Sequence, residues 1–298
     1  MTDNTPWRNT MKSFSNSMSV AKWRYIQSIH ETAALQNPDT YARHFLPALQ
    51  RWRCARLSQN ELATMRSNPF YYYLVARTRY FDGIFLDAIS NKVQHIVNVG
   101  CGSDTRSYRF EHVLQEHGVK VLECDQPEAI DGKQRIAQRR GTFDHVVYMP
   151  IDLNDGAWPD FEQWLNENNN AKILVLMEGV SPYIDSDTFS SFLSLLARKL
   201  SVGSRVAYDF KLAGGADSFG RGGRTQRPFR LPTMREEVMS YHEKFSYRVT
   251  HMEESSKISA RLLPGLEKSR GSLFKGDGLL QLEVTSQCVM ADRVTEAA

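Results

Sequence analysis

Short apolar runs alternate with amphipathic stretches through the central part of the chain. The runs are rich in Val, Ile and Leu and too brief for helices, so they predict buried strands. In the segments between them apolar residues recur every three or four positions, which predicts helices. The predicted strands are 93–99, 119–123, 145–149, 172–177 and 203–212. Strands that alternate with helices build a parallel sheet with helices on both faces, so we expect an α/β fold.

Two later segments, 245–251 and 279–291, alternate well enough to predict a hairpin-like pair of strands at one edge. The first 90 residues show no strand pattern. Residues 1–17 are polar and are expected to be mobile, whereas 19–35 has the spacing of an amphipathic helix. We therefore expect an N-terminal helical cap over residues 1–90 and a sheet domain over 91–298.

Residues 213–232 differ in composition from both parts, because glycines are interleaved with arginines. Such a segment between regular elements is typical of a lid or a binding loop. Arg224 in this segment is a candidate catalytic residue, since it could neutralise an acidic acceptor as a lid closes. Solvated charge on a mobile loop explains the same arginines equally well.

Composition excludes several classes of function. A net charge of +3 and the absence of a dense Lys/Arg run argue against a nucleic-acid partner. No apolar run has membrane length and no leader-like segment begins the chain, so we expect no membrane partner and a cytoplasmic location. The four cysteines lack C-x-x-C spacing, which predicts neither a disulfide framework nor a metal site.

The first predicted strand leads into the candidate site. Gly100-Cys101-Gly102 turns the chain without side-chain bulk, and Ser103-Asp104 can cap a following helix. This arrangement offers free backbone N–H groups to a ligand. The third glycine of the dinucleotide fingerprint is missing, so the turn alone is weak evidence. Asp125 ends the second strand 23 positions after Gly102, where such folds hold a ribose, although it could also cap a helix before Pro127.

A set of motifs, taken together, carries a family resemblance. The motifs AKWRYIQSIHE, ARTRYFD, NVGCGSDTRSYRF, LECDQPEAIDGKQ, PIDLND and LVLMEGVSPYI occur in this order. On these residues the chain resembles the leucine carboxyl methyltransferase family, as a bacterial-type member. The resemblance implies a Rossmann-like, seven-stranded methyltransferase sheet that binds S-adenosylmethionine under N-terminal helices.

The resemblance also implies which residues bind the cofactor. They are Arg77, Arg79, Gly100, Gly102, Asp125, Gln126, Asp152, Leu153 and Glu178. Arg79, with Arg77 as the alternative, would pair with the cofactor's carboxylate, because an arginine fork matches a carboxylate. Asp125 would hold the ribose and the two glycines would lie against the methionine portion.

In the same resemblance Asp152 and Leu153 would border the adenine, and Glu178 would lie near the cofactor's amino group. A solvated carboxylate at a strand end is the alternative for Glu178. Tyr183 would face the place where an acceptor enters, so it is the second candidate catalytic residue.

These inferences favour an S-adenosylmethionine-dependent O-methyltransferase acting on a small molecule, with a carboxylate or an acidic hydroxyl as acceptor. No Ser-His-Asp arrangement suggests a base, which fits an acceptor that is already ionised. Methylation of a protein's C-terminal leucine, a non-catalytic cofactor-binding module and an NAD-dependent oxidoreductase remain alternatives. The sequence fixes neither the acceptor nor the oligomeric state.

Overall fold

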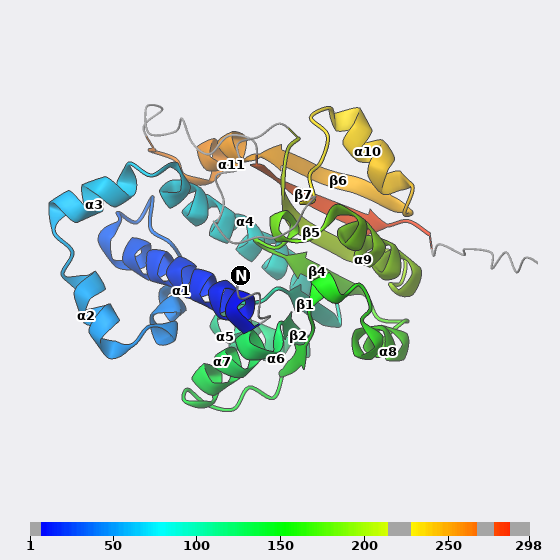
Figure 1. The fold of residues 1–298 in the computed structure, drawn as a ribbon, viewed down its shortest axis with the longest axis horizontal. Coiled ribbons are helices and arrows are strands. Elements are labelled where there is room, and N and C mark those ends of the chain that lie inside the picture. The colour runs from blue at the N-terminus through cyan, green and yellow to red at the C-terminus, as the bar shows by residue number, and fades with distance from the viewer. Residues whose placement is uncertain (1–6, 214–227, 267–276, 287–298) are drawn as a thin grey trace, which may run out of the picture.

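The computed structural model describes residues 7–213, 228–266 and 277–286. A seven-stranded sheet in the order β3-β2-β1-β4-β5-β7-β6 forms its centre (Figure 1). β1 to β5 pair in parallel, and β7 runs antiparallel to both of its neighbours, β5 and β6. The strands are β1 (His95–Val99), β2 (Lys120–Asp125), β3 (Val146–Pro150), β4 (Ile173–Met177), β5 (Arg205–Lys211), β6 (Tyr247–Glu254) and β7 (Asp277–Val284). The predicted α/β class and the seven-stranded sheet are confirmed.

Burial follows each strand's position in the sheet. Every residue of β4, at the centre, is buried, whereas β3 and β6 at the two edges are largely half-exposed. A strand covered on both faces must be apolar throughout, which explains the run Ile-Leu-Val-Leu-Met in β4. Hydrophobic burial at about 1.5–3 kcal/mol for each large side chain makes this central region the principal source of stability.

Helices cover both faces of the sheet. One face packs against α4 (Pro69–Ser90), α6 (Glu111–Glu116) and α11 (Ser255–Leu262), whose side chains share a core with β1 and β4. The other face packs against α8 (Pro159–Glu167), α9 (Ser186–Lys199) and α10 (Arg235–Glu243). The remaining helices are α1 (Trp7–His30), η1 (Thr40–Phe45), α2 (Ala48–Ala55), α3 (Gln59–Arg66), α5 (Arg106–Arg109), α7 (Pro127–Gln138), η2 (Leu153–Asp155) and η3 (Ser181–Tyr183).

The N-terminal helices have recognisable start signals. The Ser58 hydroxyl and the Glu61 carboxylate form a capping box at the start of α3. Asn68 caps α4, and Pro69 occupies its first turn, where a missing N–H costs nothing. Residues 1–17 were expected to be mobile unless a ligand orders them; α1 begins at Trp7, so the helix starts earlier than the predicted residue 19. Once a helix has nucleated, each added residue costs little, so a polar segment can extend an amphipathic helix.

Two further boundaries differ from the prediction. A single helix was expected after the glycine turn, but Phe110, with φ −103° and ψ 20°, separates α5 from α6. The two last strands pair as expected, yet α11 lies between them in the sequence and β7 inserts beside β5. Most of the predicted lid, residues 214–227 including Arg224, lies outside the described residues.

Candidate functional site

The carboxyl ends of the parallel strands meet at one edge of the sheet, where ligands bind in open α/β folds. After β1, Gly100 and Gly102 adopt positive φ values of 68° and 40°. A Cβ at Gly100 would lie 2.3 Å from Val180 Cγ2, and one at Gly102 would lie 2.9 Å from Ser17 Cβ. Glycine is therefore required at both positions for backbone conformation and for space.

Asp125 lies at the end of β2, directly beside this turn. Its Oδ2 accepts a hydrogen bond from the Gly102 N–H at 2.7 Å, and its Oδ1 accepts one from the Gln126 N–H at 2.7 Å. Burial raises the pKa of Asp125, against the two backbone N–H groups, which favour the ionised form. Each oxygen keeps a second lone pair, so the carboxylate is held in a fixed orientation and can still accept from a ligand.

Gln126 and Asp152 continue this edge toward β3. The Gln126 Nε2 donates to Asp152 Oδ2 at 2.9 Å, while Asp152 Oδ1 accepts from the Asn154 N–H at 2.9 Å. The buried Gln126 Oε1 has no hydrogen-bond partner within the described ranges. Leu153 is buried next to Asp152. The structure thus brings four predicted residues together and leaves one buried acceptor available to a ligand.

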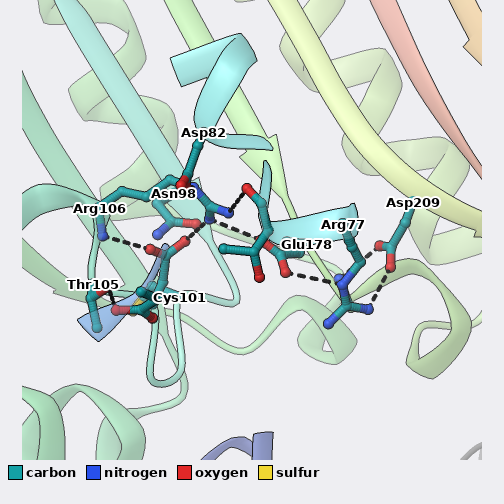
Figure 2. Close-up of polar contacts among 12 residues, drawn as sticks. Arg77, Asp82, Asn98, Cys101, Thr105, Arg106, Glu178 and Asp209 are labelled. Carbon is teal, nitrogen blue, oxygen red and sulfur yellow. Dashed lines mark hydrogen bonds and ion pairs between the residues drawn. The ribbon is translucent and has the colours of Figure 1, made fainter. Parts of the chain in front are cut away.

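Arg77 projects from α4 to the ends of β4 and β5 (Figure 2). Its Nε donates to Glu178 Oε1 at 3.0 Å and its Nη1 donates to Asp209 Oδ2 at 3.1 Å. Burial acts to raise the pKa of Glu178, but the guanidinium groups of Arg106 and Arg77 lower it below its ordinary value. Glu178 is therefore an ionised, paired carboxylate rather than a solvated one.

Arg79 lies elsewhere, although it is only two residues from Arg77. Its Nη1 donates to the Leu262 carbonyl at 2.7 Å and its Nη2 donates to the Gln36 carbonyl at 2.8 Å. Residues two apart on a helix are about 200° apart around its axis, so only one of them can face the sheet edge. The structure places Arg77 beside Glu178 and gives Arg79 a role in joining two backbone segments.

Arg106 connects these groups and was not among the predicted site residues. Its Nε donates to Asp82 Oδ1 at 2.8 Å, and its Nη1 contacts Glu178 Oε2 at 2.8 Å and also donates to Asp104. Its carboxylate partners come from α4 and from the loops that follow β1 and β4 (Figure 2). The D-T-R letters after the glycine turn and the Asp in ARTRYFD were the available signals.

A second buried ion pair lies beneath the glycine turn. The Lys133 Nζ donates to Glu123 Oε2 at 2.7 Å and to the Cys101 carbonyl at 3.3 Å, and both charged side chains are fully buried. Ser107 and Asn98 also donate to the Glu123 carboxylate, at 2.6 Å and 3.1 Å. Both Glu123 oxygens therefore accept hydrogen bonds, and the bond from Lys133 to the Cys101 carbonyl fixes that side of the turn, so its N–H side stays oriented.

Helix α1 packs over the same turn. Arg24 forms an ion pair with Asp39 at 3.0 Å and donates to the Ser103 carbonyl at 2.7 Å. The Ser103 hydroxyl donates to the Ser17 carbonyl at 2.7 Å. Figure 1 shows the start of α1 beside the ends of β1 and β2. The N-terminal helices therefore take part in shaping this edge of the sheet.

The opposite end of the edge carries Tyr183 and Asp277. Tyr183 lies in η3, directly after β4, and burial raises the pKa of its phenol against the effect of Arg77. Asp277 is the first residue of β7, and burial raises its pKa to about 7. Asp277 was not predicted, and an acidic residue before an apolar run was its only sequence signal.

Two kinds of feature are absent from the described part of the chain. It contains no group of three or more His, Cys, Asp or Glu side chains able to hold a metal ion. Within the same ranges none of the helices combines the length and apolarity that crossing a bilayer requires.

Comparison with known proteins agrees with the geometry. The sequence profile of the family described as Leucine carboxyl methyltransferase matches residues 17–197. A protein from Mycolicibacterium paratuberculosis, named "Putative S-adenosyl-L-methionine-dependent methyltransferase", is 26% identical over 220 residues, which cover 70% of this chain and 67% of that protein. A protein with the same description from Mycobacterium bovis is 28% identical over 190 residues, which cover 63% of this chain and 61% of its own length.

Among solved structures, a duf574 family protein from Streptomyces avermitilis matches with a TM-score of 0.54 and 14% identity, covering 89% of this chain and 96% of that one. At this identity the likeness concerns the fold alone. The match to the family profile extends over more than half of the chain. The protein therefore belongs to the leucine carboxyl methyltransferase family.

Proposed function

We propose that the protein transfers a methyl group from S-adenosylmethionine to an oxygen atom of a small-molecule acceptor, either a carboxylate or an acidic hydroxyl. The observation that carries this proposal is the pairing of Arg77 with Glu178 and Asp209 on the same sheet edge as Asp125. The Asp125 end of that edge suits the two hydroxyl groups of a ribose. The Arg77 and Glu178 end suits an amino-acid tail, which carries a negative carboxylate and a positive ammonium group.

The residues present fit this cofactor. Asp125 offers a fixed, twice hydrogen-bonded carboxylate to the ribose hydroxyls. The buried Gln126 Oε1, which lacks a partner within the described ranges, can accept from the adenine amino group, with Leu153 beside it. Glu178 suits the ammonium group, and Arg77 suits the carboxylate. Relatives described as S-adenosyl-L-methionine-dependent methyltransferases support the same cofactor.

The bound cofactor would supply a methyl group on a positively charged sulfur, which transfer leaves neutral. The contribution of the protein is then alignment and exclusion of water, and alignment alone can supply roughly 7–11 kcal/mol. The many paired charges around Arg106 hold the binding groups rigidly, so little reorganisation is needed at the moment of transfer.

The acceptor would enter beside Tyr183, past the ends of β4 and β5. Residues 1–90 would serve as a cap over the cofactor, since α1 contacts the glycine turn through Arg24 and Ser103. Residues 213–232 would serve as a lid, with Arg224 neutralising an acidic acceptor. A small-molecule acceptor is favoured over a protein C-terminus because half-buried Tyr183 lies among buried charged groups rather than on an open surface.

Titration calorimetry tests the cofactor assignment. S-adenosylhomocysteine should bind the full chain, NAD should not, and Asp125→Asn should weaken S-adenosylhomocysteine binding by about 10–100-fold, since a hydrogen bond to a charged group contributes about 1.5–3 kcal/mol. Glu111→Gln, a change at a half-exposed residue of α6, is the matched control and should leave the affinity unchanged. Binding of NAD instead, or equal affinity in both variants, would contradict the proposal.

A further inference from the structure

A second group of charged residues lies beyond the Arg77–Asp209 pair, where β5 meets β7. The antiparallel register places Lys211 opposite Asp277 and Asp209 opposite Leu279. Residues directly opposite each other on neighbouring strands project to the same face of a sheet, and so do residues two apart on one strand. Asp209, Lys211 and Asp277 therefore project to the same face. Arg77 reaches Asp209 from α4, so this is the face that α4 covers.

Asp277 is the unusual member of this group. Its side chain is 9% exposed, and no hydrogen bond to its carboxylate occurs among the described residues. The charged groups that act on it are Lys211 and Asp209 from β5, Arg77 from α4, and Arg230. Tyr73 of α4 and Tyr183 of η3 lie close enough for its charge to affect their ionisation.

Asp209, its neighbour on β5, is also buried, and burial raises its pKa too, but its carboxylate has partners. Asp209 Oδ2 pairs with Arg77, and Asp209 Oδ1 accepts from the Gly179 N–H at 2.7 Å. A carboxylate held in this way is a fixed acceptor, whereas a nearly buried carboxylate without a hydrogen bond is costly to ionise. Three cations lower the pKa of Asp277, yet burial still raises it to about 7. An ordinary Lys211–Asp277 ion pair would instead keep that pKa low.

We propose that Asp277 is the general base that removes the proton from an acceptor hydroxyl, so the acceptor is an alcohol or a phenol rather than a carboxylate. This inference rests on the proposed methyl transfer and specifies its substrate class. A carboxylate acceptor is already ionised and needs no base, whereas an alcohol or a phenol gains from one. Tyr183 lies close enough to Arg77, Asp209 and Asp277 for their charges to affect its ionisation, so an acceptor that enters beside Tyr183 would come near Asp277.

The proton and electron balance is complete without a further reactant. The acceptor O–H proton moves to the Asp277 carboxylate, and the oxygen electron pair forms the new bond to the methyl carbon. The bond from that carbon to sulfur breaks, and its electron pair remains on sulfur, which loses its positive charge. Asp277 then returns the proton to water. A carboxyl whose pKa is close to the working pH is well suited to this exchange.

Three full-length chains test the proposal: wild type, Asp277→Asn and Glu283→Gln. Glu283 lies at the other end of β7 and pairs with Arg248 at the surface, so its substitution is a matched control on the same strand. Each chain is given methyl-tritiated S-adenosylmethionine and a deproteinised metabolite extract. The products are then treated with alkali, which releases methanol from methyl esters and leaves methyl ethers intact, and mass spectrometry locates the methyl group.

We expect wild type and Glu283→Gln to form an alkali-stable methyl ether. We expect Asp277→Asn to transfer methyl at a rate at least about 100-fold lower than wild type, which is the usual size of a general-base contribution. The methyl-transfer rate of wild type should rise between pH 6 and 8, whereas the residual rate of Asp277→Asn should not change over that range. S-adenosylhomocysteine should bind all three chains within about twofold, because in the described part of the chain Arg77 pairs with Glu178 and Asp209, and Asp125 accepts from backbone N–H groups, without a contact from Asp277.

The other outcomes separate the two proposals. An alkali-labile product, or an Asn variant with the wild-type rate, would leave methyl transfer standing and overturn the role of Asp277. No transfer by wild type would overturn the proposed function and this inference with it. Urea unfolding gives a readout independent of turnover: wild type should lose stability relative to Asp277→Asn between about pH 4 and 7, and a constant difference would show that Asp277 does not titrate there.

Discussion

The two ends of the candidate binding edge differ in how their buried carboxylates are paired. Around Arg106, near the glycine turn, each carboxylate has a guanidinium partner, as Asp82, Asp104 and Glu178 all do. At the β5–β7 end, Asp277 is nearly buried without a hydrogen bond among the described residues. Matched charges make a rigid frame that binds without changing its ionisation, and an unmatched carboxyl is the group that can exchange a proton.

Removing the central cation of the matched region should have the largest effect. Arg106→Met leaves three buried carboxylates short of a partner, so we expect a loss of about 3–5 kcal/mol in the free energy of unfolding. Urea denaturation measures this loss. Arg135→Met, which removes an exposed cation on α7 paired only with Asp131, should change stability by less than about 0.5 kcal/mol. Similar values for both variants would show that the buried network is not cooperative.

The two regions should respond to pH with opposite signs. The Asp277 pKa is raised from 3.8 to about 7, so its protonated form stabilises the fold at low pH, and this contribution is lost as pH rises through about 7. Burial acts to raise the pKa of Asp104, but Arg106 and Lys133 lower it overall, so its contribution is present above 3.8 and lost as pH falls.

Stability curves for wild type, Asp277→Asn and Asp104→Asn measure this difference. At about 1.4 kcal/mol per pKa unit, wild type should lose about 2–4 kcal/mol relative to Asp277→Asn between pH 4 and 7. Relative to Asp104→Asn, wild type should lose stability only below about pH 4. If the stability difference from wild type changed with pH in the same direction for both variants, the two regions would not differ in how their carboxyls ionise.

A smaller effect separates the two arginines of α4. Arg77→Lys keeps the charge but loses the planar fork that contacts Glu178 and Asp209, so S-adenosylhomocysteine affinity should fall by about tenfold. Arg79→Lys changes only contacts to two backbone carbonyls and should alter that affinity by less than about twofold. Calorimetry compares the two variants, and the reverse order would move the binding role to Arg79.

The sequence predicted the sheet because its signals are local. Short Val- and Ile-rich runs, glycines with a required φ, and an acidic residue at a strand end each depend on a few neighbouring residues. The positions of Gly100, Gly102 and Asp125 at one edge follow directly from parallel strand order. The extension of α1 to Trp7 was missed because helix propagation leaves little trace in composition.

The roles of Arg106 and Asp277 could not be predicted for a different reason. A buried arginine looks the same in a sequence as an exposed one, and Arg106 is buried only because α4, the glycine loop and β4 converge on it. The environment of Asp277 depends on the insertion of β7 beside β5, which the alternating pattern of the last strands does not specify. In both cases the environment of the side chain depends on which elements pack or pair around it, and not on the residue type.

The antiparallel orientation of β7 has a consequence for how this enzyme family can vary its chemistry. A strand that enters the sheet in reverse delivers its first residue, not its last, to the edge where the five parallel strands finish. The closing portion of the chain thereby brings Asp277, the proposed base, to an edge assembled from earlier residues, without needing another crossover helix. If Asp277 has that role, substitutions near residue 277 would change the preference for the acceptor and leave the proposed cofactor-binding residues unchanged.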